Sequence, residues 1–320
     1  MKKTGKLFAL TLFTCVALGA AAAYADDFPK KDIICVWTSK VGTGGDLLLR
    51  TLGKMLQPKL NGHAMVVENR VGAGGANGFM AVNKARPDGY TLLCTSSTLP
   101  IAKLVSSVPL GHDDFKMVCG FMFDPQFIYC KADKPYNNLK ELIEYAKAHP
   151  GEMNWGRSQP TSIGTVTMAM VVGETGIKVN SIVFDSGNDV LTGVLGGHVD
   201  VGFGEYGDIK SQIEAGQFKA LCVFNDERAA LLPDVPTAKE NGFDLVIMKA
   251  RGIAAPKNTP DAVVDTLCNL FKFAYDLPEF QAYVVGEGAI AQWMPKEKLK
   301  EAYDSIADIV IKNKETILGR

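Results

Sequence analysis

The chain has 320 residues, with 34 basic and 35 acidic side chains and a formal net charge of −1 at pH 7. This balance argues against a nucleic-acid binder or a protein held on an anionic membrane, because both carry an excess of Lys and Arg. The length is enough for two domains of ordinary size.

The first 25 residues have the three parts of a secretory signal peptide. Three lysines precede an apolar stretch at residues 7–18, which is too short to span a bilayer. Ala23-Tyr24-Ala25 is a small-x-small cleavage site. A lipoprotein signal modified at Cys15 is the alternative, and the bulky Phe13 fits it poorly. We expect cleavage after Ala25 and export of a soluble chain.

The cysteines of the exported chain are predicted to be free. Export permits disulfides, but five of the six cysteines lie in short apolar runs typical of strand interiors, where Cys acts as a small buried side chain. The sequence has no CxxC pair, so metal or redox chemistry has little support. The six are Cys35, Cys94, Cys119, Cys130, Cys222 and Cys268.

The first part of the chain reads as alternating strands and helices. Strands are predicted at residues 32–38, 64–67 and 90–95. A helix after residue 46 is indicated by the stripe Leu48, Leu52, Met55 and Leu56. Helices between consecutive strands predict a parallel sheet. Its ligands collect at the carboxyl ends of the strands, which places residues 38–46 and 95–98 at the binding edge.

Two extended segments divide the chain into two lobes. Residues 115–123 and 126–130 are strand-like and separated by Asp124-Pro125, which we interpret as the crossing into a second lobe. The alternation of strands and helices then repeats in the second lobe. Residues 245–255 are extended and return to the first lobe before a helical tail. We therefore predict an α/β protein with a ligand cleft between the lobes. Lobe 1 comprises residues 26–125 and 249–320, and lobe 2 comprises residues 126–248.

Two loops are candidates for binding an anion. Residues 42–46 and 158–164 each precede a helix, whose first N–H groups are unpaired and partly positive. Glycines allow close backbone approach, and hydroxyl side chains add donors. The alternative is that these residues only cap their helices. Lys40 and Arg157 lie in the same loops, where Arg can pair with a carboxylate in bidentate fashion.

Other functional patterns are weak. The loop at residues 72–78 resembles a GxGxxxG dinucleotide loop, but it follows the second strand rather than the first. The segment at residues 156–160 lacks the last glycine of a GxSxG nucleophile elbow. The four histidines show no paired metal-ligand spacing. We therefore expect no catalysis, no metal and no cofactor.

Four stretches of the chain form a recognisable set. They are Val67-Glu68-Asn69-Arg70-Val71-Gly72-Ala73-Gly74-Gly75, Arg86-Pro87-Asp88-Gly89-Tyr90-Thr91-Leu92-Leu93, Ala146-Lys147-Ala148-His149-Pro150-Gly151 and Leu232-Pro233-Asp234-Val235-Pro236-Thr237. Through these stretches, in this order, the chain resembles the periplasmic solute-binding receptors of tripartite tricarboxylate transporters, also called Bug receptors, and the resemblance covers nearly all of the exported chain.

The resemblance implies a two-lobed, type II-like periplasmic binding protein. Such a receptor captures a small organic carboxylate between its lobes and delivers it to membrane permease subunits. The chain departs from the family pattern at two places. Thr43 replaces the second glycine of the first loop while Asp46 is kept, and Phe184-Asp185-Ser186-Gly187 replaces a common Pro-Tyr-Lys-Gly, which removes a basic residue.

Ligand identity is open among a hydroxy acid, an amino acid and an aromatic acid. Alternatives to transport are a ligand-sensing receptor for a membrane signalling partner and an exported hydrolase. We expect a monomer that binds no nucleic acid. The predicted ligand contacts are Ser39, Gly42, Thr43, Gly44, Gly45, Asp46, Ser96, Ser97, Arg157, Ser158, Thr161, Ser162, Thr165, Phe184, Asp185 and Ser186.

Overall fold

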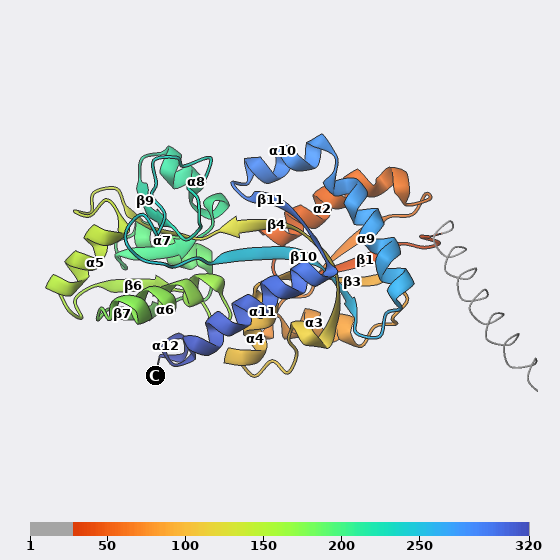
Figure 1. The fold of residues 1–320 in the computed structure, drawn as a ribbon, viewed down its shortest axis with the longest axis horizontal. Coiled ribbons are helices and arrows are strands. Elements are labelled where there is room, and N and C mark those ends of the chain that lie inside the picture. Colours follow the sequence, from red (N-terminus) through yellow and green to blue (C-terminus); the bar gives the residue numbers. More distant parts are fainter. Residues whose placement is uncertain (1–27, 320) are drawn as a thin grey trace, which may run out of the picture.

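A computed structural model describes residues 28–319 as two α/β lobes lying side by side, which Figure 1 shows. The predicted signal peptide, with its cleavage site after Ala25, lies outside the described residues. Within residues 28–319, the helices are all too short or too polar to cross a membrane.

The sheet of lobe 1 is mixed. Its strands follow the order β11-β4-β10-β3-β1-β2. β1 pairs in parallel with both β2 and β3, whereas β10 is antiparallel to β3 and β4, and β11 is antiparallel to β4. The strands are β1 Ile33–Trp37, β2 Met65–Asn69, β3 Thr91–Ser96, β4 Phe115–Pro125, β10 Met248–Pro256 and β11 Ile290–Pro295.

The sheet of lobe 2 has the order β7-β6-β8-β5-β9. β6 pairs in parallel with β7 and β8, and β5 runs antiparallel between β8 and β9. The carboxyl ends of β6, β7 and β8 therefore share one edge. The strands are β5 Phe127–Lys131, β6 Asn154–Arg157, β7 Asn180–Val183, β8 Val201–Gly204 and β9 Phe218–Val223.

Helices cover both faces of each sheet. In lobe 1, α2 (Gly44–Leu56), α9 (Asp261–Tyr275) and α10 (Pro278–Gly286) share one apolar cluster with the sheet. The other face packs on α3 (Ala76–Asn83), α4 (Thr98–Val105) and α11 (Lys296–Lys312). In lobe 2, one face packs on α5 (Leu139–Ala148) and α6 (Ile163–Thr175), and the other on α7 (Gly187–Leu195) and α8 (Tyr206–Glu214).

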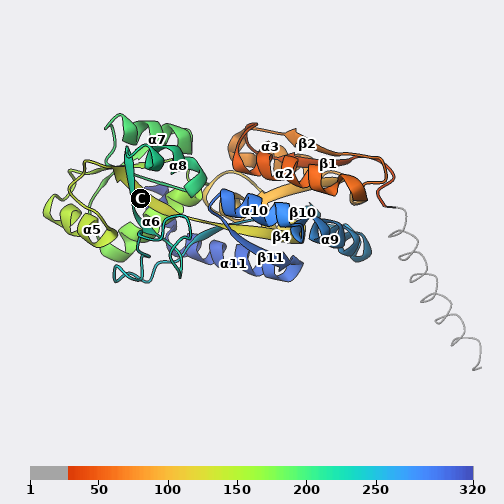
Figure 2. The same cartoon turned by 90° about the horizontal axis from the view of Figure 1, so that it is seen from above.

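The lobes are connected by more than the two crossing strands. β4 leads directly into β5 through Gln126, and β10 returns to lobe 1. The last helices, α11 and α12 (Lys314–Leu318), also bury Ile306, Val310 and Ile317 in the apolar cluster of lobe 2. Figures 1 and 2 show α11 starting under lobe 1 and the chain ending under lobe 2. The predicted domain bounds remain our interpretation.

The structure differs from the sequence prediction in three details. The lobe 1 sheet was expected to be parallel, but the returning strands β10 and β11 run antiparallel. Asp124 and Pro125 do not break a strand, since β4 continues through both. The elements α4, α8 and β11 were not predicted. These elements are short, so they leave weak periodic patterns.

Candidate functional site

The first turn of α2 presents three unpaired backbone donors. Thr43 is the N-cap residue, but its hydroxyl donates to the Lys40 carbonyl at 2.7 Å and accepts from Trp37 Nε1 at 2.8 Å, so it does not cap the helix. Within residues 28–319, the N–H groups of Gly44, Gly45 and Asp46 have no hydrogen-bond acceptor. This turn follows the carboxyl end of β1, where the sequence predicts binding.

Asp46 stabilises this loop from within. The Asp46 side chain is buried and accepts two hydrogen bonds from Arg50, at 3.0 Å each, and one from the Gly42 N–H at 2.9 Å. Burial alone would raise the pKa of Asp46, but the bonds from Arg50 and Gly42 hold that pKa below its usual value. The carboxylate is therefore ionised and already paired.

The predicted serines beside this loop are also engaged. Ser97 Oγ accepts from the Ala250 N–H at 3.1 Å, which ties the end of β3 to β10. Ser96 Oγ accepts from the Thr98 N–H at 3.4 Å. The Ser39 carbonyl accepts from Asn69 Nδ2 at 3.1 Å. The Ser97 contact positions the end of β3 against the crossing strand β10, and the other two contacts lie among the loops and strand ends of lobe 1.

The predicted loop of lobe 2 reaches lobe 1. Thr161 is 8% exposed, and its Cγ2 lies 3.7 Å from where a Cβ would stand on Gly74. Ser162 caps α6 by accepting from the Gly164 N–H at 3.2 Å. The Thr165 hydroxyl donates to the Ser158 carbonyl at 3.0 Å. The glycine loop at residues 72–78 thus lies at the contact between the lobes.

Arg157, the last residue of β6, has an incomplete set of partners. Its Nε donates to Ser181 Oγ at 2.6 Å, whereas its Nη1 is buried and has no acceptor within residues 28–319. Burial lowers the pKa of this guanidinium. A buried donor without an acceptor costs roughly 1–3 kcal/mol. A bound anion would remove this cost.

The last predicted stretch follows β7. The Phe184 ring packs against Gly193 of α7, because a Cβ there would lie 2.7 Å from its Cζ. Asp185 is exposed. Ser186 caps α7 by accepting from the Asp189 N–H at 3.2 Å and donates to the Asp189 carboxylate. Ser162 therefore serves as a helix cap, which is the alternative stated for its loop, and Ser186 is a helix cap as well.

A charged cluster that was not predicted from the sequence lies at the crossing between the lobes. Arg251 on β10 is 6% exposed and donates from Nε to the Asp124 carboxylate on β4. Lys249 pairs with Glu205 at 3.1 Å, and Gln126 Nε2 donates to the same carboxylate at 2.9 Å. Charged residues inside otherwise apolar strands were the sign that could have identified it.

Mutual pairing favours the charged forms of Arg251 and Glu205, whereas burial raises the pKa of Asp124. Burial alone would lower the pKa of Arg251, but the charges of Asp124 and Glu205 raise it. Burial alone would raise the pKa of Glu205, but Lys249, Arg251 and the bond from Gln126 lower it to about 2. The cluster joins β4 and β10 to the start of α8 at the carboxyl end of β8.

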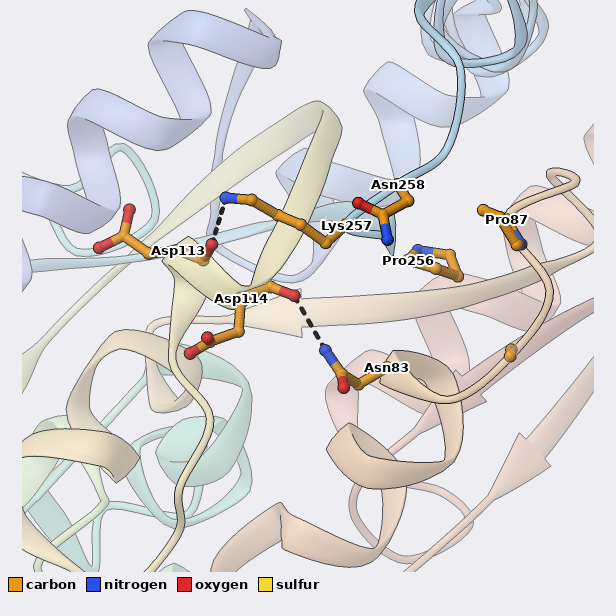
Figure 3. Close-up of a pocket in the computed structure, with 8 residues that line it drawn as sticks. Asn83, Pro87, Asp113, Asp114, Pro256, Lys257 and Asn258 are labelled. Atoms are coloured by element: carbon orange, nitrogen blue, oxygen red, sulfur yellow. Dashed lines mark hydrogen bonds between the residues drawn. The ribbon is translucent and has the colours of Figure 1, made fainter.

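A surface hollow of about 330 Å³ lies at the other end of β4 and β10 (Figure 3). Its walls include Asn83, which donates to the Asp114 carbonyl at 3.0 Å, and Lys257, which donates to the Asp113 carbonyl. β4 has 11 residues, so this hollow is roughly 30 Å from the crossing. It is remote from the loops that the sequence singles out.

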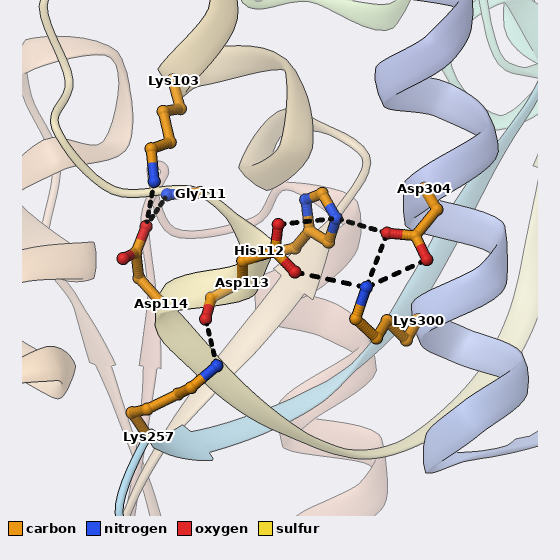
Figure 4. Close-up of polar contacts among 8 residues, drawn as sticks. All are labelled: Lys103, Gly111, His112, Asp113, Asp114, Lys257, Lys300 and Asp304. Carbon is orange, nitrogen blue, oxygen red and sulfur yellow. Dashed lines mark hydrogen bonds and ion pairs between the residues drawn. The ribbon is translucent and has the colours of Figure 1, made fainter.

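Next to that hollow, His112, Asp113 and Asp304 come close enough to bind a metal ion. Figure 4 shows that Lys300 occupies this position. Its Nζ lies 2.8 Å from Asp304 Oδ1 and 3.2 Å from Asp113 Oδ1, while His112 Nε2 is 2.8 Å from the same Asp304 oxygen. Because the ammonium already forms ion pairs with both carboxylates, a metal ion would have to displace it. We assign no metal to this cluster.

Comparison with known proteins identifies the fold. A UPF0065 protein in the gbd 5' region of Cupriavidus necator is 30% identical over 275 residues, covering 83% of this chain and 82% of that protein. The structure of periplasmic binding protein BugD has a TM-score of 0.78 and 28% identity, covering 90% of this chain and 99% of its own. R. palustris Rpa4515 with adipate has a TM-score of 0.80 and 22% identity, covering 91% and 98% of the two chains.

The fold predicted from the sequence is confirmed, because two α/β lobes match those of periplasmic binding proteins. This fold and its family are those of solute-binding receptors rather than enzymes. The model of the protein family described as "Tripartite tricarboxylate transporter family receptor" matches residues 48–318 of this chain. The chain therefore belongs to the family of tripartite tricarboxylate transporter receptors.

Proposed function

We propose that this protein is a periplasmic receptor that binds a small organic carboxylate between its lobes and delivers it to the membrane permease of a tripartite tricarboxylate transporter. The single observation that carries this proposal is the first turn of α2, where three N–H groups lack acceptors. Helix N-termini bind carboxylates through such groups and the helix dipole. R. palustris Rpa4515, which has a similar fold, has a structure with adipate, and adipate is a small organic carboxylate.

The proposal includes export and the contacts predicted from the sequence. Cleavage after Ala25 releases a monomer into the periplasm. The ligand lies between the loops at residues 39–46 and 96–97 of lobe 1 and those at residues 157–165 and 184–186 of lobe 2. Gly74 and Thr161 approach each other across the two lobes, which supports a site between the lobes.

A thermal-shift screen tests the function. The mature protein is unfolded in urea and refolded to remove any carried-over ligand. It is then screened against succinate, malate, adipate, citrate, glutamate and benzoate. A ligand that binds only the folded state raises the melting temperature, and at 100 times its Kd it adds about 2.7 kcal/mol. Calorimetry should confirm at least one hit. A folded protein with no hit, or one that turns over an ester substrate, contradicts the proposal.

A further inference from the structure

The Arg251 guanidinium packs against the start of α2. A Cβ placed on Gly44 would lie 2.7 Å from Arg251 Nη2 and 3.0 Å from Nη1. Residue 44 must therefore be glycine for the guanidinium to stay where it is. Arg251 comes from β10 and lies between the helix start in lobe 1 and the crossing to lobe 2.

Only one edge of this guanidinium is paired. Among the described residues, Asp124 is the only hydrogen-bond acceptor of the Arg251 side chain, and it binds Nε. Both Nη groups lack acceptors, although Arg251 is only 6% exposed. The neighbouring acid, Glu205, is already bonded to Lys249 and Gln126. Neither Nη group is among the fully buried side-chain atoms that lack a partner, so both keep some contact with solvent and are available to donate to a bound ligand.

The position of the Arg251 guanidinium beside a helix start favours an anion as its acceptor. The start of a helix carries a partial positive charge, so a guanidinium next to it is unfavourable unless negative charge lies between them. Asp124 supplies one such charge at Nε, on the other edge of the group. The Nη groups and the N–H groups of Gly44 and Gly45 remain. A planar carboxylate can accept two parallel bonds from guanidinium nitrogens.

We infer that Arg251 is a ligand-binding residue that holds a carboxylate of the transported solute through Nη1 and Nη2, beside the first turn of α2. Asp124 is its positioning residue, because it fixes Nε. This inference rests on the proposed function and adds to it one side chain that the sequence analysis did not select. It also makes recognition specific for a carboxylate, since a neutral amide cannot accept both bonds while balancing the charge.

Three variants test the inference. Arg251→Lys keeps the charge but loses the planar pair of donors. The double variant Arg251→Gln with Asp124→Asn removes both charges together, which avoids an unpaired buried acid. Arg86→Gln is the matched control, because Arg86 is exposed in the turn before β3, at the opposite edge of the sheet. Circular dichroism checks that each variant is folded.

The readout is the calorimetric Kd for whichever of succinate, malate, adipate, citrate, glutamate or benzoate binds the wild type. We expect both Arg251 variants to bind at least about tenfold more weakly, the order for lost charge-assisted bonds. The control should stay within about twofold. Folded Arg251 variants with wild-type Kd overturn this inference alone. A wild type that binds no member of the panel overturns the proposed function with it.

A structure of the ligand-bound wild type gives a second measurement, independent of whether the variants fold. A ligand carboxylate oxygen within about 3.5 Å of Arg251 Nη1 or Nη2 supports the inference. A ligand that lies elsewhere in the cleft, with both Nη groups facing water, overturns it. A ligand held only by the α2 backbone also overturns it while leaving the proposed function intact.

Discussion

Lys249 and Glu205 form an ion pair between the crossing strand β10 and the start of α8, with 3.1 Å between Nζ and Oε2. Each side chain is 17% exposed. Glu205 also accepts from Gln126 Nε2 at 2.9 Å, between β4 and β5. The pair therefore connects a lobe 2 helix to the two segments that join the lobes.

Replacing Lys249 with Met should destabilise the protein. The variant leaves Glu205 half-buried without its cation, and breaking a buried pair on one side costs about 3–5 kcal/mol. We expect the free energy of unfolding, measured with urea, to fall by the lower part of that range. The double variant Lys249→Met with Glu205→Gln should recover most of the loss.

Lys298→Met is the control for this prediction. Lys298 is 66% exposed and pairs with Glu301 at 2.7 Å on the surface of α11. Exposed pairs contribute about 0–1 kcal/mol, so this variant should unfold almost as the wild type does. If Lys249→Met loses no more stability than Lys298→Met, the Lys249–Glu205 pair does not hold the lobes together.

The same pair predicts sensitivity to acid. The pKa of Glu205 is lowered from 4.5 to about 2 in the folded protein. A carboxyl whose folded pKa is depressed stabilises the protein above its unfolded pKa, and this contribution is lost as pH falls toward the folded pKa. The window is therefore between pH 4.5 and about 2. The urea midpoint should fall more steeply between pH 5 and 3 in the wild type than in Glu205→Gln, and parallel slopes would contradict this.

The sequence predicted the elements that depend on local pattern. The stripe of Leu48, Leu52 and Leu56 is buried on α2 as expected. This stripe depends only on the spacing of residues along one helix. The two lobes also followed from the order of strands and helices, since parallel strands need helical crossovers.

The charged cluster could not be predicted in this way. Arg251 and Asp124 are 127 residues apart in sequence, and they meet only because β10 pairs antiparallel with β4. The roles of single side chains depend on the same long-range packing. The Thr43 hydroxyl was expected to be a ligand donor, but it lies between Trp37 and Lys40. This role of Thr43 depends on where the Trp37 indole packs, which the sequence does not show.

Gly45 should be intolerant of a side chain. A Cβ there would lie 2.5 Å from the Trp37 ring, so the ring or the helix start must move. We expect Gly45→Ala to cost about 1–3 kcal/mol of stability and to weaken carboxylate binding. Gly286→Ala in α10 is the control, because its added methyl meets no atom within 4 Å. It should be neutral or stabilising by up to about 1 kcal/mol. Equal effects of the two variants would contradict the close contact.

The thiols should be unreactive in the folded protein. The structure confirms free cysteines among the described residues, with all except Cys268 buried. Burial raises the pKa of Cys94 and Cys130 to about 12 each. These side chains therefore stay in the thiol form, which is inert, because only the thiolate is nucleophilic. Ellman's reagent should label at most one thiol in native protein and six in urea. Dithiothreitol should leave the unfolding midpoint unchanged, and a large fall would indicate a disulfide.

Arg157→Ala should weaken carboxylate binding. The Arg157 Nη1 group is buried without an acceptor while Nε is held by Ser181, so the free protein retains a donor that a ligand carboxylate can satisfy. Loss of a charged hydrogen bond costs about 1.5–3 kcal/mol, which corresponds to a roughly tenfold or greater rise in calorimetric Kd. Arg228→Ala, on an exposed lobe 2 residue paired with Glu240, is the control. An unchanged Kd in Arg157→Ala would show that Arg157 is not in the binding site. The buried Nη1 group without an acceptor would then only destabilise lobe 2.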